Sequence, residues 1–266
     1  MFNAQHKVMP LVESLLQEQD NWMRFCAMWL VSLAYAGTGD RRALSILLKT
    51  AVTDSNGDVR RVAVIGQSFV LINHNQELPE MTRLMLESYN PNLRFGALLA
   101  LGIGFAGTGN VDALDMIDAL MRTDKVDHVR QAAMMAAAMV LMQQPADRQA
   151  PLRAHLERIA GTKHEEALAK FGAVLAQGIL DMGGRNQIIS LTTANGQLRP
   201  LAVAGMTMFC QFWFWYANVN FLSLSATPTG LIGVTCTDQV PVMTVTCHAR
   251  PSLFAYPEPV RGDKEI

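Results

Sequence analysis

Apolar residues recur at helical spacing through the first two thirds of the chain. In residues 43–52, Leu44, Leu47, Leu48 and Ala51 occupy positions i, i+3, i+4 and i+7, the apolar face of an amphipathic helix. The same pattern is found in residues 7–17, 78–86, 112–121 and 152–159. Each segment is predicted to be the second helix of a helix pair, and residues 7–17 are predicted to be the second helix of a pair whose first helix is absent.

The first helix of each pair is marked by a basic anchor residue with Ala three positions later. Five anchors follow one another at separations of 36, 34, 36 and 40 residues. The anchors are Arg24, Arg60, Arg94, Arg130 and Lys170, and their alanines are Ala27, Ala63, Ala97, Ala133 and Ala173. The position eight after each anchor is small: Ser32, Ser68, Gly102, Ala138 and Gly178. Small residues at a fixed place let neighbouring helices approach closely, so the pattern predicts an α-solenoid of about five helix-pair repeats over residues 1–184.

Two interpretations of the anchor cations are compatible with the sequence. A solenoid exposes equivalent positions along one shared face, so the arginines could line a surface that binds a partner. Alternatively, each could form hydrogen bonds to carbonyl groups of a neighbouring helix. Replacing one anchor by Ala separates the two interpretations, because only the second predicts lost stability with unchanged partner binding.

Two Gly-Thr-Gly connections, 70 residues and therefore two repeats apart, are predicted to be tight turns. They contain Gly37 and Gly39, and Gly107 and Gly109. Glycine reaches the left-handed backbone region that ends many helices, so a helix C-cap and turn is the favoured interpretation. A phosphate-binding loop would need a preceding strand and a third glycine, and the sequence contains neither at these places.

Beyond residue 184 the pattern changes, and a small β-rich domain is predicted for residues 185–257. Asn195-Gly196 is a strong hairpin signal after the candidate strand 188–193. Further strands are predicted at 205–216, 231–235 and 240–247. The end of the chain from Tyr256 is Pro-rich and charged, so residues 258–266 are predicted to be an extended arm. The fold class is therefore α+β.

The aromatic run at 212–215 lies inside one of these predicted strands. Because alternate residues of a strand point to opposite faces, Phe212 and Phe214 would fill a core while Trp213 and Trp215 face the helical array or a partner. Burial of all four side chains within the chain is the simpler alternative. The surrounding apolar run, residues 201–216, is shorter than a membrane span requires and contains Gln211, so no membrane partner is expected.

Composition excludes several classes of function. The formal charge is −1 and the sequence pI about 6.6, so no nucleic-acid partner is expected. The four cysteines are far apart, have no metal-ligand spacing, and are expected to be buried thiols. No cofactor is expected, no nucleophile–base pair, paired carboxylates or metal cluster stands out, and no enzyme is predicted. The N-terminal residues do not form a signal peptide, which suggests a cytoplasmic or nuclear location.

Several stretches, taken together, resemble one protein family. They are Ser88-Tyr89-Asn90-Pro91, Arg94-Phe95-Gly96-Ala97, Ala100-Leu101-Gly102-Ile103, Ala106-Gly107-Thr108-Gly109, Val129-Arg130-Gln131-Ala132, Ala169-Lys170-Phe171-Gly172-Ala173, Ala176-Gln177-Gly178-Ile179, Gln211-Phe212-Trp213-Phe214-Trp215, Phe221-Leu222-Ser223-Leu224, Thr227-Pro228-Thr229 and Phe254-Ala255-Tyr256-Pro257. The chain resembles the larger proteasome/cyclosome-repeat scaffold subunit family of the 26S proteasome regulatory particle, over about residues 24–257. A free-standing helical-repeat adaptor would share the repeat period but should lack the β segment with its aromatic run.

The resemblance implies a non-catalytic scaffold with an arc of about five repeats from a helical toroid, followed by a β domain. It implies as partners the other subunits of the regulatory particle, namely the base ATPases and lid subunits that include the deubiquitinase. The family's ubiquitin receptor site is held in a tail that would lie beyond Ile266, so it is not expected here.

Overall fold

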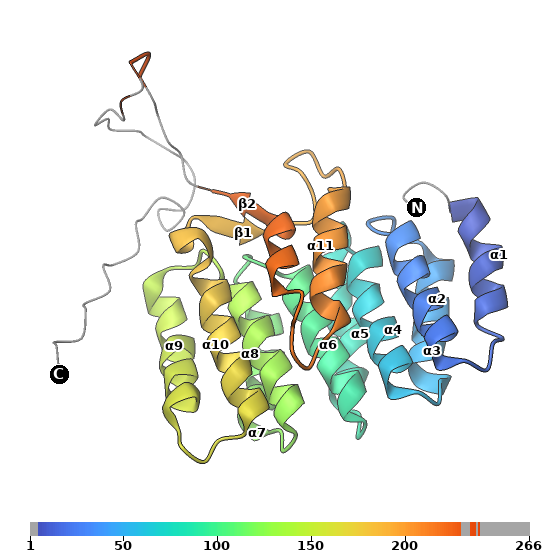
Figure 1. The fold of residues 1–266 in the computed structure, drawn as a ribbon, viewed down its shortest axis with the longest axis horizontal. Coiled ribbons are helices and arrows are strands. Elements are labelled where there is room, and N and C mark those ends of the chain that lie inside the picture. Colours follow the sequence, from blue (N-terminus) through green and yellow to red (C-terminus); the bar gives the residue numbers. More distant parts are fainter. Residues whose placement is uncertain (1–4, 230–234, 238, 240–266) are drawn as a thin grey trace.

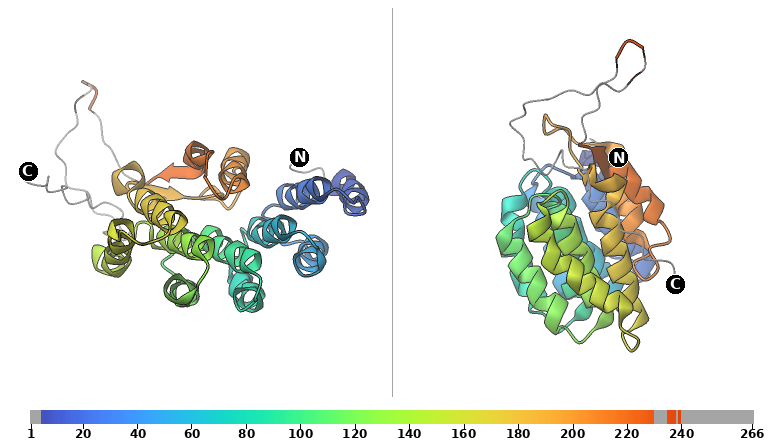
Figure 2. Two further views of the ribbon diagram at one scale, coloured as in Figure 1. Left: turned by 60° about the horizontal axis from the view of Figure 1, so that its bottom comes forward. Right: turned by 90° about the vertical axis from the view of Figure 1, so that its left-hand side faces the viewer.

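The computed structural model describes residues 5–229, 235–237 and 239. Ten helices of this part form five stacked layers (Figure 1). The inner row consists of α2 (Asn21–Ala34), α4 (Gly57–Val70), α6 (Pro91–Gly104), α8 (Asp127–Leu141) and α10 (Ala167–Leu180). The outer helices are α1 (Gln5–Leu15), α3 (Arg41–Thr53), α5 (Leu78–Leu86), α7 (Val111–Thr123) and α9 (Ala146–Gly161). The predicted α-solenoid is confirmed, and Figure 2 shows the two rows end-on.

Polar caps fix where many of these helices begin. The side chains of Asp20, Asp40, Asn56, Asn90 and Asn110 each accept a hydrogen bond from a backbone N–H in the first turn of the following helix. Each cap satisfies a donor that the helix itself leaves unpaired. These five residues therefore mark where α2, α3, α4, α6 and α7 begin.

Close approach between inner helices depends on small residues. A side chain added at Gly102 of α6 would place its Cβ 2.7 Å from the Cα of Ala136 in α8. One added at Gly96 would lie 2.8 Å from the carbonyl oxygen of Arg61 in α4. The five alanines that follow the anchors are fully buried in the same core. Helix-to-helix packing at this distance excludes larger side chains and holds the register of the layers.

One prediction for the C-terminal segment, the strand at 205–216, is wrong. Residues 205–216, predicted as a strand, form most of α11 (Pro200–Gln211) and the turn that follows it. The helix starts at Pro200, whose missing N–H costs nothing at a first helical position. Its buried residues, among them Ala202, Met206, Phe209 and Cys210, have helical spacing. This helical spacing could not be recognised in the sequence because almost every residue in the run is apolar. There were too few polar positions to mark a solvent-exposed face.

Short β structure frames α11. β1 (Gln187–Ile189) pairs antiparallel with β2 (Ala226–Pro228), with Ile188 opposite Thr227. The predicted Asn-Gly turn is present, since Gly196 has a φ of 75° and its N–H donates to the carbonyl of Thr193. The predicted strand at 240–247 and the arm at 258–266 lie outside the described residues, as does 231–235 except for Thr235.

The 3-10 helix η3 (Val219–Ser225) lies beside α11, and Ser225 Oγ donates to the carbonyl of Ala202. Two shorter 3-10 turns are η1 (Asn75–Glu77) and η2 (Met182–Arg185). Figure 2 shows that α11, η3 and the two strands lie on the side of the inner row that faces away from the outer helices. The array therefore supports the C-terminal segment on its inner face.

Candidate functional site

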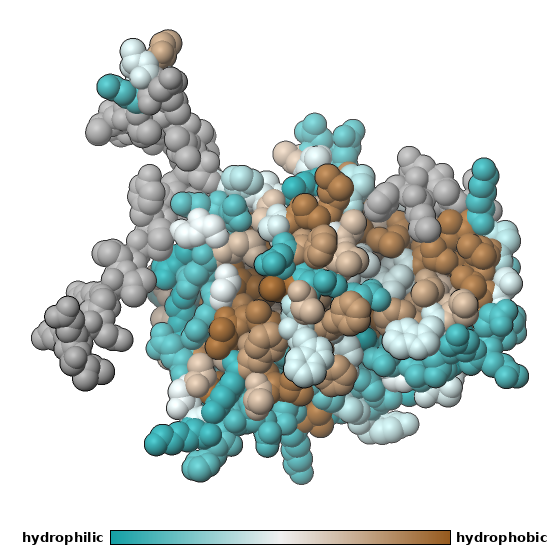
Figure 3. All heavy atoms as spheres, in the orientation of Figure 1, coloured by the Kyte–Doolittle hydropathy of each residue, from teal (hydrophilic) through white to brown (hydrophobic). Residues whose placement is uncertain are grey.

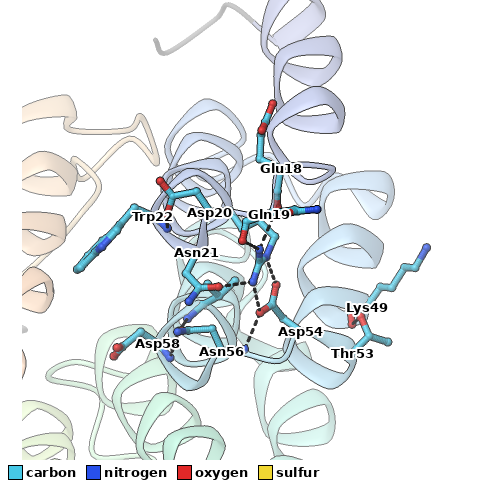
Figure 4. A network of polar contacts seen from close by, with 12 residues as sticks. Glu18, Gln19, Asp20, Asn21, Trp22, Lys49, Thr53, Asp54, Asn56 and Asp58 are labelled. Atoms are coloured by element: carbon cyan, nitrogen blue, oxygen red, sulfur yellow. Dashed lines mark hydrogen bonds and ion pairs between the residues drawn. The ribbon is translucent and has the colours of Figure 1, made fainter.

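The anchor cation Arg24 binds the loop that leads into its inner helix, α2. Arg24 Nε donates to Asp54 Oδ2 at 2.7 Å, and its Nη1 donates to the carbonyls of Glu18 and Gln19 at 3.0 and 2.8 Å. Its Nη2 donates to the side chain of Asn21 at 2.6 Å (Figure 4). The hydrogen bond to Asp54 raises the pKa of Arg24 above its usual value. One guanidinium thus joins the start of α2 to the end of α3.

The same arrangement recurs two repeats later. Arg94 Nε lies 2.7 Å from Asp124 Oδ2, and Arg94 Nη1 donates to the carbonyls of Ser88 and Tyr89 at 2.7 and 3.1 Å. The side chain of Arg94 is 14% exposed and that of Asp124 is 4% exposed. Both aspartates stand 30 residues after their arginines, a spacing that was visible in the sequence and could have identified them.

The other three anchors make different contacts. Arg60 Nε donates to the carbonyl of Ala51 at 2.7 Å. Arg130 Nη2 lies 2.6 Å from Asp127 and 2.8 Å from Glu165. Lys170 Nζ donates to the carbonyl of Lys163 at 3.3 Å. All five cations therefore bond to groups of this chain, but only Arg60 bonds to a carbonyl within a neighbouring helix, so the choice between the two interpretations of the anchors stays a prediction.

The Gly-Thr-Gly turns bind the end of the next inner helix. Gly37 and Gly39 donate their N–H groups to the carbonyls of Phe69 and Val70 at 2.8 and 3.0 Å. Gly107 and Gly109 repeat this with Met139 and Val140 at the same two distances. All four glycines have φ between 61° and 71°, a region that side chains disfavour. These N–H groups satisfy helix carbonyls instead of surrounding a phosphate.

Trp213 fixes the turn after α11 to three inner helices. Its indole Nε1 donates to Asp58 Oδ1 at 3.2 Å, and its ring lies 4.9 Å from that of Phe95 and 5.0 Å from that of His128. The guanidinium carbon of Arg61 lies 5.1 Å from the indole centroid, a cation–π distance. Trp213 is therefore an intramolecular contact between the C-terminal segment and the array.

The neighbouring aromatic residues differ from the predicted alternation. Phe214 stacks on Trp213 at 3.7 Å yet stays half exposed, and Phe212 is 55% exposed. The prediction that both phenylalanines fill a core is wrong, because the run forms a turn in which side chains do not alternate between two faces. Trp215 is 76% exposed, so burial of all four side chains is also excluded.

Arg61, which sequence reasoning did not select, is the most deeply buried charged side chain at this contact. It is 1% exposed, and its Nη2 lies 3.2 Å from Asp58 Oδ1. Desolvation lowers the pKa of Arg61, while the nearby Asp58 carboxylate acts in the opposite direction. Burial also raises the pKa of the adjacent Cys210 thiol to about 12, which keeps that thiol unreactive.

The cysteine prediction is only partly right. Cys210 is buried, but Cys26 and Cys236 are exposed, and Cys247 lies outside the described residues. Within the described ranges, no group of three or more potential metal ligands is found. No helix among them is both long and apolar enough to cross a membrane.

Known proteins resemble the chain over nearly its whole length, although no family model matches it. It is 41% identical to the 26S proteasome non-ATPase regulatory subunit 1 of Drosophila melanogaster over 99% of its own residues and 26% of the fly protein. It is 44% identical to homolog B of that subunit in Arabidopsis thaliana, over 94% of this chain and 25% of the plant protein. It is 43% identical to the Saccharomyces cerevisiae 26S proteasome regulatory subunit RPN2, over 91% of this chain and 26% of the yeast protein. The chain thus spans about a quarter of the length of these relatives.

Proposed function

The chain belongs to the family of 26S proteasome non-ATPase regulatory subunit 1, and on that premise we propose that it is a non-catalytic scaffold element of the proteasome regulatory particle. The observation that carries the proposal is identity of 40–44% to these subunits across nearly the whole chain. Because the match includes only about a quarter of each relative, the scaffold role concerns this segment and its contacts.

The arrangement of the molecule supports a structural role. The Gly-Thr-Gly turns hold one repeat to the next, the Arg24–Asp54 and Arg94–Asp124 pairs join the two helices of one repeat, and Trp213 holds the C-terminal segment to the array. A solenoid built in this way presents a long, rigid surface, which suits a protein that positions other subunits. Its partners would be base ATPases and lid subunits, including the deubiquitinase, in the cytoplasm and the nucleus.

The exposed residues at the end of α11 are our candidate for a partner contact. Phe212, Phe214 and Trp215 together leave three aromatic side chains in solvent beside the buried Trp213. Aromatic residues of this kind are enriched among those that contribute most to binding at protein interfaces. This turn would therefore meet a neighbouring subunit of the regulatory particle.

We also propose two further features of the fold. The array would form an arc of a toroid, and the strands predicted at 231–235 and 240–247 would add to the short sheet of β1 and β2. The antiparallel pairing of β1 with β2 supports this, because β2 ends at Pro228, a short distance before the first of those predicted strands.

A chimera in yeast tests the proposal. The segment of RPN2 that matches this chain is replaced by residues 1–266, and assembly is followed by native electrophoresis with a peptidase overlay. We expect 26S particles to form, and we expect Trp215→Ala to reduce their yield while leaving the melting temperature of the purified chain unchanged. A chimera that is expressed and folded but does not enter 26S particles would exclude the scaffold role.

A further inference from the structure

We propose that the groove between the outer helices α3 and α5 binds an amphipathic helix of a partner protein. The partner helix would have one apolar face, acidic residues along one flank and basic residues along the other. The inference goes beyond the scaffold role and does not depend on it. We call this groove the α3–α5 groove, and its walls are Leu44, Leu48, Lys49 and Val52 of α3 and Glu80 and Met81 of α5.

The α3–α5 groove is an open depression of about 920 Å³ on the outer row of the array. Its two helices lie between α1 and α7 in that row, so a neighbouring layer is present on either side. Figure 2 shows the outer helices on the side of the inner row that faces away from α11. The groove is therefore separate from the hydrophobic surface around α10 and α11 that Figure 3 shows.

The groove exists because each outer helix packs mainly on an inner helix. α3 packs mainly on α4, and α5 packs mainly on α6. The two inner helices approach closely at Gly96, where an added Cβ would lie 2.8 Å from the carbonyl oxygen of Arg61. In the outer row, α5 has only 9 residues, whereas α3 has 13. A short α5 covers less of the side of α3 than a helix of equal length would.

An apolar row runs along the α3 wall. Leu44, Leu48 and Val52 stand four residues apart, which places them one above another on the same helix face. Leu44 is buried, Leu48 is half-buried and Val52 is 65% exposed, so the row becomes more open toward the end of α3. On α5, Met81 is half-buried and Leu84, three residues later, is 79% exposed. Removing these apolar surfaces from water would favour binding.

The charges of the groove differ in sign between its two walls. One end is bridged by an ion pair, in which Arg41 Nη1 lies 2.8 Å from Glu77 Oε2. Farther along, Lys49 on the α3 wall and Glu80 on the α5 wall are exposed, and neither forms an ion pair within the described part of the chain. A partner with acidic groups beside α3 and basic groups beside α5 complements these two charges.

A helix fits the groove as α3 itself fits the inner row, where it lies against both α2 and α4. Side-chain ridges of a third helix can enter the groove between two others. The α3 wall extends from Arg41 to Thr53, about 18 Å at 1.5 Å per residue, so about three helical turns would fill it. An extended strand is disfavoured, because the walls are helices and offer no sheet edge for strand addition.

The test is a fluorescence anisotropy titration with a labelled Ala-based peptide of about 16 residues, long enough to form an isolated helix. The peptide has Leu at positions i, i+4, i+7 and i+11, Glu along one flank and Lys along the other. We expect saturable binding to the purified 266-residue chain. Peptides with Glu on both flanks or Lys on both flanks should bind about fivefold more weakly, because one flank then meets a wall of like charge.

Val52→Arg tests the apolar wall. It should weaken binding of the mixed-charge peptide at least about tenfold, because a long charged side chain replaces an exposed apolar one in the groove. The matched control is Val111→Arg at the start of α7, where the side chain is 56% exposed but does not line the groove. This control should bind like the parent chain, and circular dichroism checks that each variant is folded.

Lys49→Glu tests the charge pattern. It makes both walls acidic, so the variant should prefer the peptide with Lys on both flanks over the mixed-charge peptide. Glu80→Lys makes both walls basic and should shift the preference to the peptide with Glu on both flanks.

Several results would overturn the proposal. They are a parent chain without saturable binding, a Val52→Arg variant that binds like the parent, an equal loss in Val111→Arg, and an unchanged peptide preference in Lys49→Glu. Binding that appears only after residues 230–266 are removed would also overturn it, because that segment would then be the occupant. So would a particle heavier than 29.2 kDa in sedimentation velocity that returns to 29.2 kDa in Val52→Arg, because a second copy would then fill the groove.

Discussion

The repeats of the array and the C-terminal segment are attached by different kinds of contact. Along the array the same contacts recur, so that Arg24 with Asp54 is matched by Arg94 with Asp124, and one Gly-Thr-Gly turn by the other. The segment around α11 is instead held by contacts that do not repeat, namely the cluster in which Trp213 contacts Asp58, Arg61, Phe95 and His128 and the hydrogen bonds that join Gln143 to Gln187 and Thr229. Loss of one repeated contact should therefore lower stability less than loss of Trp213, which makes most of its contacts at a single place in the array.

The largest expected effect comes from Trp213→Ala. The substitution removes a nearly fully buried indole and uncovers the Arg61 guanidinium, so we expect a loss of about 3–5 kcal/mol in the free energy of unfolding. Urea unfolding followed by circular dichroism measures the loss, and hydrogen exchange should show α11 opening before the inner helices. Trp215→Ala is the control, because its side chain is mostly in solvent; an equal loss in both variants would contradict the attachment described here.

Arg94→Ala should have the next largest effect. It leaves Asp124 buried without its cation and frees the carbonyls of Ser88 and Tyr89, at a cost of about 2 kcal/mol because the pair keeps some contact with solvent. Arg60→Ala removes a hydrogen bond to the carbonyl of Ala51 and should cost about 1 kcal/mol. Urea midpoints of the two variants test this order, which would be wrong if Arg60→Ala were the more damaging.

Gly109→Ala tests the Gly-Thr-Gly turns. We expect it to lower the free energy of unfolding by about 1–2 kcal/mol. The residue has a φ of 61°, and its added Cβ would lie 2.5 Å from Gln144 Oε1, so backbone strain and a collision act together. Gly184→Ala is the matched control, since Gly184 has a φ of 66° but open space around it. Thermal unfolding should rank Gly109→Ala as less stable; equal melting temperatures would mean that Gln144 moves aside.

The smallest effect concerns pH. Desolvation lowers the pKa of His128 and of His155 in the folded chain. As pH falls, the unfolded chain therefore takes up protons on these histidines at a higher pH than the folded chain does. This uptake lowers the free energy of unfolding as pH falls through about 6.5 and has no effect on it well above that pH. Melting temperatures between pH 8 and pH 5.5 should show this decline, and His128→Phe should make it shallower. A decline of unchanged slope in His128→Phe would exclude His128 as a contributor.

The helical array could be predicted from the sequence because the residues that define it recur at a regular interval. Every repeat has a basic anchor, an Ala three positions later and a small residue five positions after that. The two small positions recur because neighbouring inner helices pack closely there. The glycine turns followed from the left-handed backbone that they require. The carboxylate partners Asp54 and Asp124 were missed although their spacing from the arginines is equally regular.

The C-terminal segment could not be predicted in the same way. Residues 201–216 are apolar almost throughout, so neither a period of two nor one of 3.6 stands out, and the aromatic residues favoured a strand. The burial of the Arg61 side chain could not be predicted from the sequence either. It adjoins the anchor Arg60 in sequence, and only the packing of Trp213, about 150 residues later, buries it.

The most direct test of the scaffold assignment is a native gel of source-cell lysate, probed with an antibody against this chain and overlaid for peptidase activity. The assignment predicts that the antibody signal migrates with the 26S proteasome and its activity, and that it leaves this position when the regulatory particle is dissociated. A signal that migrates apart from the proteasome under conditions that keep 26S particles intact would contradict it.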